Sequence, residues 1–191
     1  LGLHGSDEWE TTETRFGYES PTTPGQVFDY DMASQARTLI KTQEVPSGHS
    51  IDDYVVHRIM APSHDGVHVP VTVMHHRDTP LDGTAPLYLY GYGSYGMSMP
   101  ASFSIKRLSL ADRGMITATA HVRGGADMGY GWYLDGKMEK KTNTFIDFIA
   151  ARDALVDRGW VDGTRVGAEG GSAGGMLMGA IANMAPEKFA S

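Results

Sequence analysis

Cysteine is absent from this 191-residue sequence, and its absence removes several classes of protein at once. Without thiols the chain has no disulfide framework, no cysteine nucleophile and no thiolate metal site. The sequence also lacks an apolar run long enough to cross a bilayer, and it shows no charged start followed by an apolar segment and a cleavage site. We therefore expect neither secretion nor membrane insertion, and a cysteine-free chain fits a cytoplasmic location.

Positive charge is also in short supply, because 16 Lys and Arg stand against 23 Asp and Glu, for a formal net charge of −7. Surfaces that bind nucleic acid are rich in cations, so this balance argues against a nucleic-acid partner. The surplus of carboxylates favours positively charged ligands, which it attracts at long range. A chain of this length has room for the core of one domain and part of another.

The order of strands and helices indicates an α/β protein. Through about Val45 the chain reads as short strands separated by turns, and from Asp53 longer apolar runs begin, with a hairpin signal, Asp-Gly, at 65–66. Strands and helices alternate after Ala85, which indicates a largely parallel sheet covered on both faces. The expected strands are 14–19, 26–31, 37–42, 54–60, 67–74, 85–90, 115–122 and 165–169, and the expected helices are 101–113, 143–158 and 173–183.

A serine between glycines gives the strongest chemical signal. Residues 170–174, Gly-Gly-Ser-Ala-Gly, fit the G-x-S-x-G pattern between an expected strand and an expected helix, where that pattern forms a nucleophile elbow. Side chains two positions from Ser172 would collide in so sharp a turn, so glycine is needed there. The Ala173 amide then points into the space where negative charge develops during acyl transfer. The alternative is a flexible glycine loop that happens to contain serine.

Two other patterns compete with this interpretation. Residues 91–96 match G-x-G-x-x-G after a strand, as in dinucleotide-binding turns. Four residues intervene before the next helical periodicity and two tyrosines crowd the turn, so we expect no cofactor. A metal site would need several histidines on one face and a carboxylate to complete the set, which the spacing does not provide, so we interpret the histidines as scattered surface residues and expect no metal. The histidines considered are His64, His68, His75 and His76.

Three stretches resemble the prolyl oligopeptidase family of serine peptidases, in particular its oligopeptidase B branch. They are LYGYGSYG at 89–96, LADRGMITATAHVRGGADMGYGWYLDGKMEKKTNTFIDF at 110–148 and GGSAGGMLMG at 170–179. The resemblance implies an α/β-hydrolase domain over 47–191, as the N-terminal part of its sheet, preceded over 1–46 by the last strands of a β-propeller. It also implies cleavage of short basic peptides after Arg or Lys through an acyl-enzyme.

By the family pattern, Ser172 is the nucleophile, and the Ala173 amide and the Tyr92 hydroxyl form the oxyanion hole. Tyr95 would line the pocket for the side chain before the scissile bond. Taken without the resemblance, the two tyrosines are equally well explained as aromatic packing at the end of a strand. The family pattern also suggests Asp127 and Arg123 as substrate-binding residues, whereas their loop by itself reads as an ordinary one.

Some features depart from the family pattern or leave alternatives open. Residues 97–102 contain none of the acidic residues common in bacterial oligopeptidase B, and Asp127 stands where the family usually has Glu. All eight histidines precede Ser172, although α/β-hydrolases place the nucleophile before the acid and the histidine. We therefore expect an interior fragment of a longer enzyme, inactive by itself. The alternatives are cleavage after Pro, a catalytically dead binding scaffold and a non-peptidase esterase.

Overall fold

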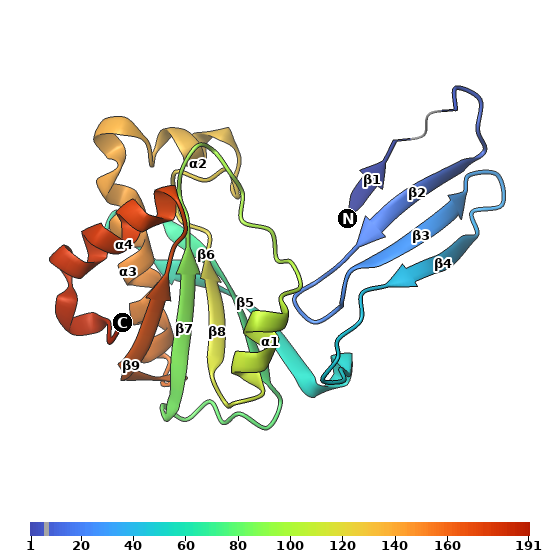
Figure 1. Cartoon of the computed structure of the whole chain (residues 1–191). Coiled ribbons are helices and arrows are strands. Elements are labelled where there is room, and N and C mark those ends of the chain that lie inside the picture. Colours follow the sequence, from blue (N-terminus) through green and yellow to red (C-terminus); the bar gives the residue numbers. More distant parts are fainter. Residues whose placement is uncertain (6–7) are drawn as a thin grey trace.

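The computed structural model describes residues 1–5 and 8–191, which form two β-sheets joined by a linker (Figure 1). The first sheet is antiparallel, with four strands in the order β1-β2-β3-β4. Its strands are β1 at Gly2–His4, β2 at Glu13–Tyr18, β3 at Gln26–Asp31 and β4 at Arg37–Thr42. A short 3₁₀ helix at Ile51–Asp53 precedes the second sheet.

The second sheet is mixed, with the strand order β5-β6-β8-β7-β9. β5 and β6 form an antiparallel hairpin and β6 is antiparallel to β8, whereas β8, β7 and β9 run parallel. The bounds are β5 at Tyr54–Pro62, β6 at His68–His76, β7 at Ala85–Gly91, β8 at Ile116–Ala120 and β9 at Val161–Glu169. Parallel neighbours need crossover connections, and helices provide them here.

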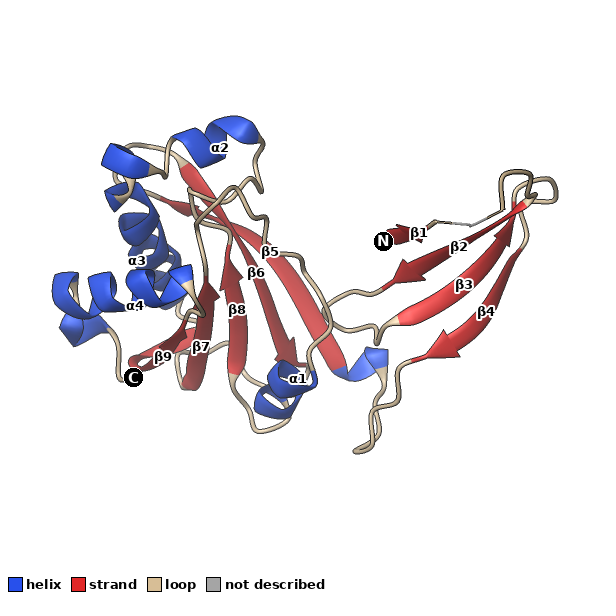
Figure 2. Cartoon of the chain, turned by 45° about the horizontal axis from the view of Figure 1, so that its top comes forward, coloured by secondary structure: helices blue, strands red, loops and turns tan. Residues whose placement is uncertain are grey.

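Helices cover both faces of the second sheet (Figure 2). The helices are α1 at Ile105–Ala111, α2 at Tyr130–Leu134, α3 at Thr142–Asp157 and α4 at Ala173–Met184. Alternate residues of β7 separate the faces: Leu87 and Leu89 are fully buried in the core shared with α3 and α4, while the rings of Tyr88 and Tyr90 lie under Lys106 and Arg107 of α1. The expected parallel sheet with two covered faces is confirmed for β8, β7 and β9.

The helix expected over 101–113 is shorter than predicted because Ser104 begins it. The Ser104 hydroxyl accepts a hydrogen bond from the Arg107 amide at 3.4 Å, which caps the first turn. Phe103 therefore lies outside the helix, where its buried ring packs edge-on against His49. Neither β1 nor α2 was expected from the sequence, and β9 begins four residues before its predicted start at Arg165.

The interpretation of the four histidines as surface residues is wrong for His75, which is only 4% exposed. Its Nε2 lies 3.1 Å from Nε2 of His57, and its Nδ1 lies 2.8 Å from the carbonyl oxygen of His76. Among the described residues, no three His, Cys, Asp or Glu side chains are grouped so that they could hold a metal ion. No helix within residues 1–5 and 8–191 is long and apolar enough to cross a membrane.

Candidate active site

Ser172 forms the turn between β9 and α4. Its backbone has φ 53° and ψ −119°, a conformation that residues with a side chain rarely adopt. Such strain persists only where the surrounding structure imposes it, and it is concentrated at functional sites. Ser172 is also exposed. A strained, accessible serine between a strand and a helix has the geometry of a nucleophile elbow.

The glycines on either side of Ser172 allow this turn to lie against the end of β7. A Cβ added to Gly170 would lie 2.5 Å from the carbonyl oxygen of Gly174, and one added to Gly174 would lie 2.9 Å from the carbonyl oxygen of Gly91. Both distances are too short for non-bonded heavy atoms, so neither position accepts a side chain without moving backbone. The predicted steric reason for the two glycines is confirmed.

Tyr92 lies beside the first turn of α4, which begins at Ala173. A Cβ on Gly174 would lie 3.6 Å from both Cα and Cδ2 of Tyr92, so the tyrosine ring borders the first turn of α4. The amides of Gly174 and Gly175 bond back into the turn, to the oxygens of Gly171 and Ser172 at 2.7 and 2.8 Å. The Ala173 amide has no such acceptor among the described residues. A free amide at a helix N-terminus favours an anion.

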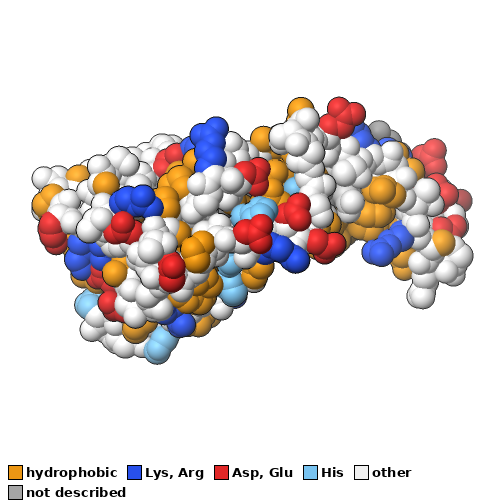
Figure 3. All heavy atoms as spheres, turned by 90° about the horizontal axis from the view of Figure 1, so that it is seen from below, with side chains coloured by type: hydrophobic (Ala, Val, Ile, Leu, Met, Phe, Trp, Pro, Cys, Tyr) orange, Lys and Arg blue, Asp and Glu red, His pale blue; other side chains and the backbone are white. Residues whose placement is uncertain are grey.

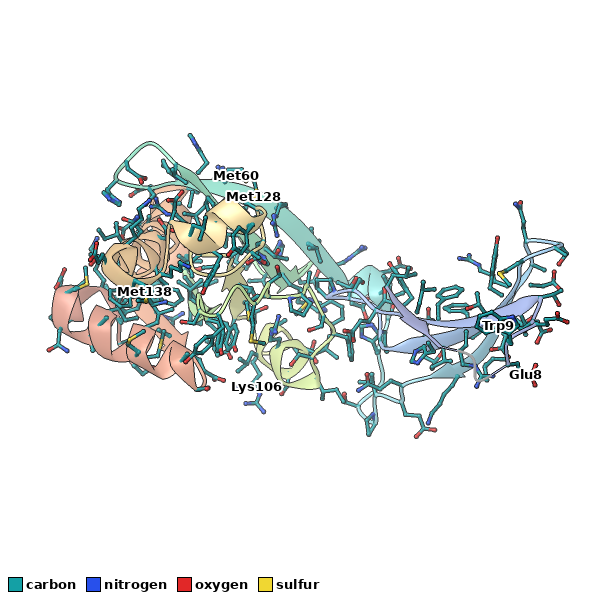
Figure 4. The ribbon with its side chains drawn as sticks, turned by 90° about the horizontal axis from the view of Figure 1, so that it is seen from above. Glu8, Trp9, Met60, Lys106, Met128 and Met138 are labelled. Carbon is teal, nitrogen blue, oxygen red and sulfur yellow. The ribbon has the colours of Figure 1, made fainter. Side chains whose placement is uncertain are left out.

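Tyr95 lines a pocket that also reaches the start of α4. It is 76% exposed, and its backbone has φ 58°. The pocket has a volume of about 330 Å³, and its walls include both Tyr95 and Ala173. Met138, labelled in Figure 4 near α4, also contributes to these walls and is 83% exposed. The structure therefore brings Tyr95 and the start of α4 to one hollow.

The turn that carries both tyrosines rests on the loop after β8 and the start of α3. Gly93 has φ 67°, and a Cβ there would lie 2.4 Å from Cγ2 of Thr144 and 2.7 Å from Cγ2 of Val122. The Gly96 amide donates to the Gly124 carbonyl oxygen at 3.0 Å. Glycine is therefore required at position 93 both by its backbone conformation and by the close approach of Thr144.

Arg123 lies inside the protein, only 3% exposed, and bonds to groups of the chain itself. Its guanidinium donates to Asp147 through Nε at 2.8 Å and Nη2 at 2.7 Å, and to Asp65 through Nη1 at 2.5 Å. The Ser63 hydroxyl donates to the same Asp147 carboxylate at 2.7 Å. Hydrogen bonding to Asp147 and then to Asp65 raises the pKa of Arg123 above its ordinary value. This network ties the β5–β6 hairpin to α3.

Asp127 is also held by neighbouring groups, and its side chain is 8% exposed. One carboxylate oxygen lies 2.9 Å from Nδ1 of His121 and accepts the backbone amide of Met99 at 3.0 Å. Nε2 of His121 lies 2.8 Å from the Thr72 hydroxyl, so the carboxylate connects residues 97–104 to the sheet. No sequence pattern singled out His121. None of the eight histidines hydrogen-bonds Ser172 within the part of the chain that the structure describes.

Comparison with known proteins agrees with this geometry. Residues 101–191 match the prolyl oligopeptidase family. Over 99% of its length the chain is 47% identical to dipeptidyl aminopeptidase BI of Pseudoxanthomonas mexicana and 41% identical to protease 2 of Moraxella lacunata. The chain belongs to the prolyl oligopeptidase family. The resemblance seen in the sequence is thus confirmed, and the chain spans about a quarter of the length of these family members, 26% and 27%.

Solved structures of the family superpose closely on this chain. Oligopeptidase B from Leishmania major has a TM-score of 0.90 at 44% identity, over 95% of this chain and 25% of that one. Oligopeptidase B from Trypanosoma brucei with covalently bound antipain has a TM-score of 0.90 at 41% identity, over 95% of this chain and 26% of that one. The two-sheet arrangement described above is therefore shared with prolyl oligopeptidase family members.

Proposed function

We propose that this chain supplies the nucleophile and the oxyanion hole of a serine oligopeptidase that cleaves short peptides after Arg or Lys. The strained, exposed Ser172 between Gly170 and Gly174 carries the proposal, because that turn has no structural need for a serine. Two candidate donors belong to this joint: the hydroxyl of Tyr92, whose ring borders the first turn of α4, and the free amide of Ala173. Family membership supports peptide as the substrate class.

In the proposed reaction, the Ser172 hydroxyl attacks the peptide carbonyl while a general base takes its proton. The Ala173 amide and the Tyr92 hydroxyl bind the oxygen that becomes negative, and the tetrahedral intermediate collapses to an acyl-enzyme that water then hydrolyses. We propose that the base and its acid partner come from a longer protein, because hydrolases place both after the nucleophile and every histidine here precedes it.

We propose that residues 47–191 are the N-terminal part of an α/β-hydrolase sheet. The parallel order β8-β7-β9, the helices on both faces and the elbow after β9 support this assignment. Residues 1–46 would be the last strands of a β-propeller, because a four-stranded antiparallel sheet is the unit of that architecture. A cytoplasmic location stays a prediction from the sequence.

Preference for a basic side chain rests on similarity to the oligopeptidase B structures and on Tyr95, whose ring offers a cation–π surface. Arg123 and Asp127, suggested by the family pattern as substrate contacts, are instead bonded to protein groups. We propose that these two residues support the site without touching the peptide, and that the carboxylates selecting Arg or Lys lie outside this sequence.

Removal of dipeptides from a free N-terminus is a second candidate activity, because the relative with 47% identity is called a dipeptidyl aminopeptidase. Cleavage after Pro is a third, because prolyl oligopeptidase A of Galerina marginata is 36% identical over 90% of this chain. Matched peptides that differ only in a blocked or free N-terminus, or in Arg, Lys or Pro before the scissile bond, separate the three activities.

The proposal is tested in a longer protein that contains this sequence. Ser172→Ala should lower kcat on an arginyl peptide by at least about 10⁴-fold, since the nucleophile is lost while the fold is kept. The 191-residue chain alone should show no measurable hydrolysis. If Ser172→Ala retains the wild-type rate, the nucleophile is another residue. If the unsubstituted longer protein is inactive on every peptide, the scaffold interpretation replaces the enzyme.

A further inference from the structure

Lys141, at the start of α3, is held in an unusual way. Its Nζ donates to the carbonyl oxygen of Gly93 and, at 2.9 Å, to the hydroxyl of Ser94. It also borders the pocket next to Ala173, and its Nζ lies 6.0 Å from the ring centre of Phe145. Partial burial lowers the pKa of Lys141. The Lys141 ammonium thus donates to two uncharged oxygens of the same turn.

Other lysines of the chain show how different this is. Lys106, Lys140 and Lys188 each pair with a carboxylate at the surface. Lys141 has no carboxylate within ion-pair distance in the part of the chain that the structure describes. Taking a charge partly out of water without a counter-ion is unfavourable, and only the hydrogen bonds to the turn offset it. The hydrogen bonds to the turn are therefore the interactions that keep the Lys141 ammonium in this place.

The oxygens that Lys141 binds lie between the two tyrosines of the site. Gly93 follows Tyr92 directly, and Ser94 precedes Tyr95. Fixing the Gly93 carbonyl oxygen fixes the peptide plane that follows it, because the peptide group is rigid. Gly93 also lies close against the Thr144 side chain, so the turn is fixed both by this contact and by the hydrogen bonds from Lys141.

We infer that Lys141 is a positioning residue for the oxyanion hole: its ammonium clamps the peptide between Gly93 and Ser94 and thereby keeps the Tyr92 hydroxyl aimed at the elbow. This inference rests on the proposed roles of Ser172 and Tyr92. In this inference Lys141 acts on the transition state through Tyr92 and not through a contact of its own with the peptide. A donor displaced by even about 1 Å stabilises the developing charge far less.

The test is steady-state kinetics on one arginyl peptide, in a longer protein that contains this sequence. Lys141→Met removes the donors and keeps the length of the side chain, and it should lower kcat by about tenfold to a hundredfold, with KM changed by less than about twofold. Lys140→Met is the matched control, because it removes the same charge from the preceding residue, whose Nζ pairs with Asp135 at the surface. The control should keep the wild-type kcat.

A double variant decides whether Lys141 acts through Tyr92. Tyr92→Phe alone should lower kcat by about a hundredfold to a thousandfold. Residues that act as a unit are not additive, so Tyr92→Phe combined with Lys141→Met should be no slower than Tyr92→Phe alone. Multiplied losses, an unchanged kcat in Lys141→Met, or a rise in KM alone would each overturn the inference.

Failure of the inference and failure of the proposed function give different results. If Ser172→Ala and Tyr92→Phe lose activity while Lys141→Met does not, only the role of Lys141 is wrong. If Tyr92→Phe keeps the wild-type kcat, the oxyanion role of that tyrosine is wrong. Thermal melting confirms that each variant folds. Should Lys141→Met fail to fold, Lys141→Gln, which keeps one donor group without the charge, should still lower kcat at constant KM, and a wild-type kcat would refute the clamp.

Discussion

Leucines show how differently the two sheets are used: Leu87 and Leu89 in β7 are completely buried, whereas Leu39 in β4 is 51% exposed and Leu3 in β1 is 76% exposed. No strand of the first sheet contributes to the hydrophobic core, which lies between the second sheet and the helices α3 and α4. In Figure 3, hydrophobic side chains of the first sheet, on the right, accordingly reach the surface. Strand pairing forms both sheets, but only the second is also stabilised by a core of fully buried apolar side chains.

Ion pairs repeat the contrast. Arg123 and Asp147 form a two-point ion pair beside the second sheet, at 3% and 0% side-chain exposure. Arg15 and Asp29 form a similar two-point pair across β2 and β3, but at 53% and 30% exposure. Water competes for the exposed pair, whereas it is excluded from the buried pair. The same residue types should therefore differ greatly in their contribution to stability.

Breaking the buried ion pair should have the largest effect. Asp147→Ala leaves part of the Arg123 guanidinium buried without its partner, and we expect a loss of about 4 kcal/mol in the free energy of unfolding. Asp29→Ala is the exposed control and should leave the thermal midpoint almost unchanged. Equal shifts of the midpoint in the two variants would show that burial is not what separates the two regions.

Truncating one leucine in each region should give the next largest difference. Leu177 of α4 is fully buried, and its Cδ2 lies close to Gly91 at the elbow joint. Leu177→Ala should cost about 3 kcal/mol through lost burial and a cavity. Leu39→Ala should have little effect, because that side chain is half exposed. Chemical denaturation of both variants measures the difference, and a large loss in Leu39→Ala would mean that the first sheet is covered in solution.

Lowering the pH should reduce the stability of the part of the chain that contains the second sheet, through protonation of Asp65. Hydrogen bonding from Arg123 holds the pKa of Asp65 below its usual value. A carboxylate with a lowered pKa stabilises the fold above its unfolded pKa, near 4, and that stability is lost as the pH falls through the lowered value. Asp65→Asn should therefore melt below the wild type at pH 7, by less than Asp147→Ala, and the difference should begin to shrink below about pH 4 and vanish below the lowered pKa of Asp65. A difference independent of pH would contradict this.

A surface charge on the first sheet should have the smallest effect on folding. Ile40, in β4, is 50% exposed. Ile40→Lys should change the unfolding free energy of the 191-residue chain by no more than about 0.5 kcal/mol, while reducing aggregation measured by light scattering, because a charged side chain replaces a half-exposed apolar one. In a longer protein where propeller strands cover this face, the same substitution should be destabilising, and indifference there would argue against the propeller assignment.

Local patterns were sufficient for most of the fold. Alternating and apolar runs placed the strands within a few residues, and G-x-S-x-G with its flanking strand and helix placed Ser172 at its turn. The short helix at Tyr130–Leu134 was not predicted, because five residues that include a glycine show no helical periodicity. Lys141 and His121 could not be found, because their roles depend on partners that only the folded chain brings near; the carbonyl oxygen of Gly93 is 48 residues away from Lys141 in the sequence.

The strained backbone of Ser172 affects which substitutions this position can accept during evolution. At φ 53° glycine has less backbone strain than any residue with a side chain, and the strain of such a conformation costs about 1–3 kcal/mol. Selection for stability alone would replace this serine, whereas selection for the proposed nucleophile would keep it. The proposed role of Ser172 as nucleophile therefore predicts a trade between stability and activity at this position, and a Ser172→Gly protein that melts higher while losing hydrolysis would show that conflict directly.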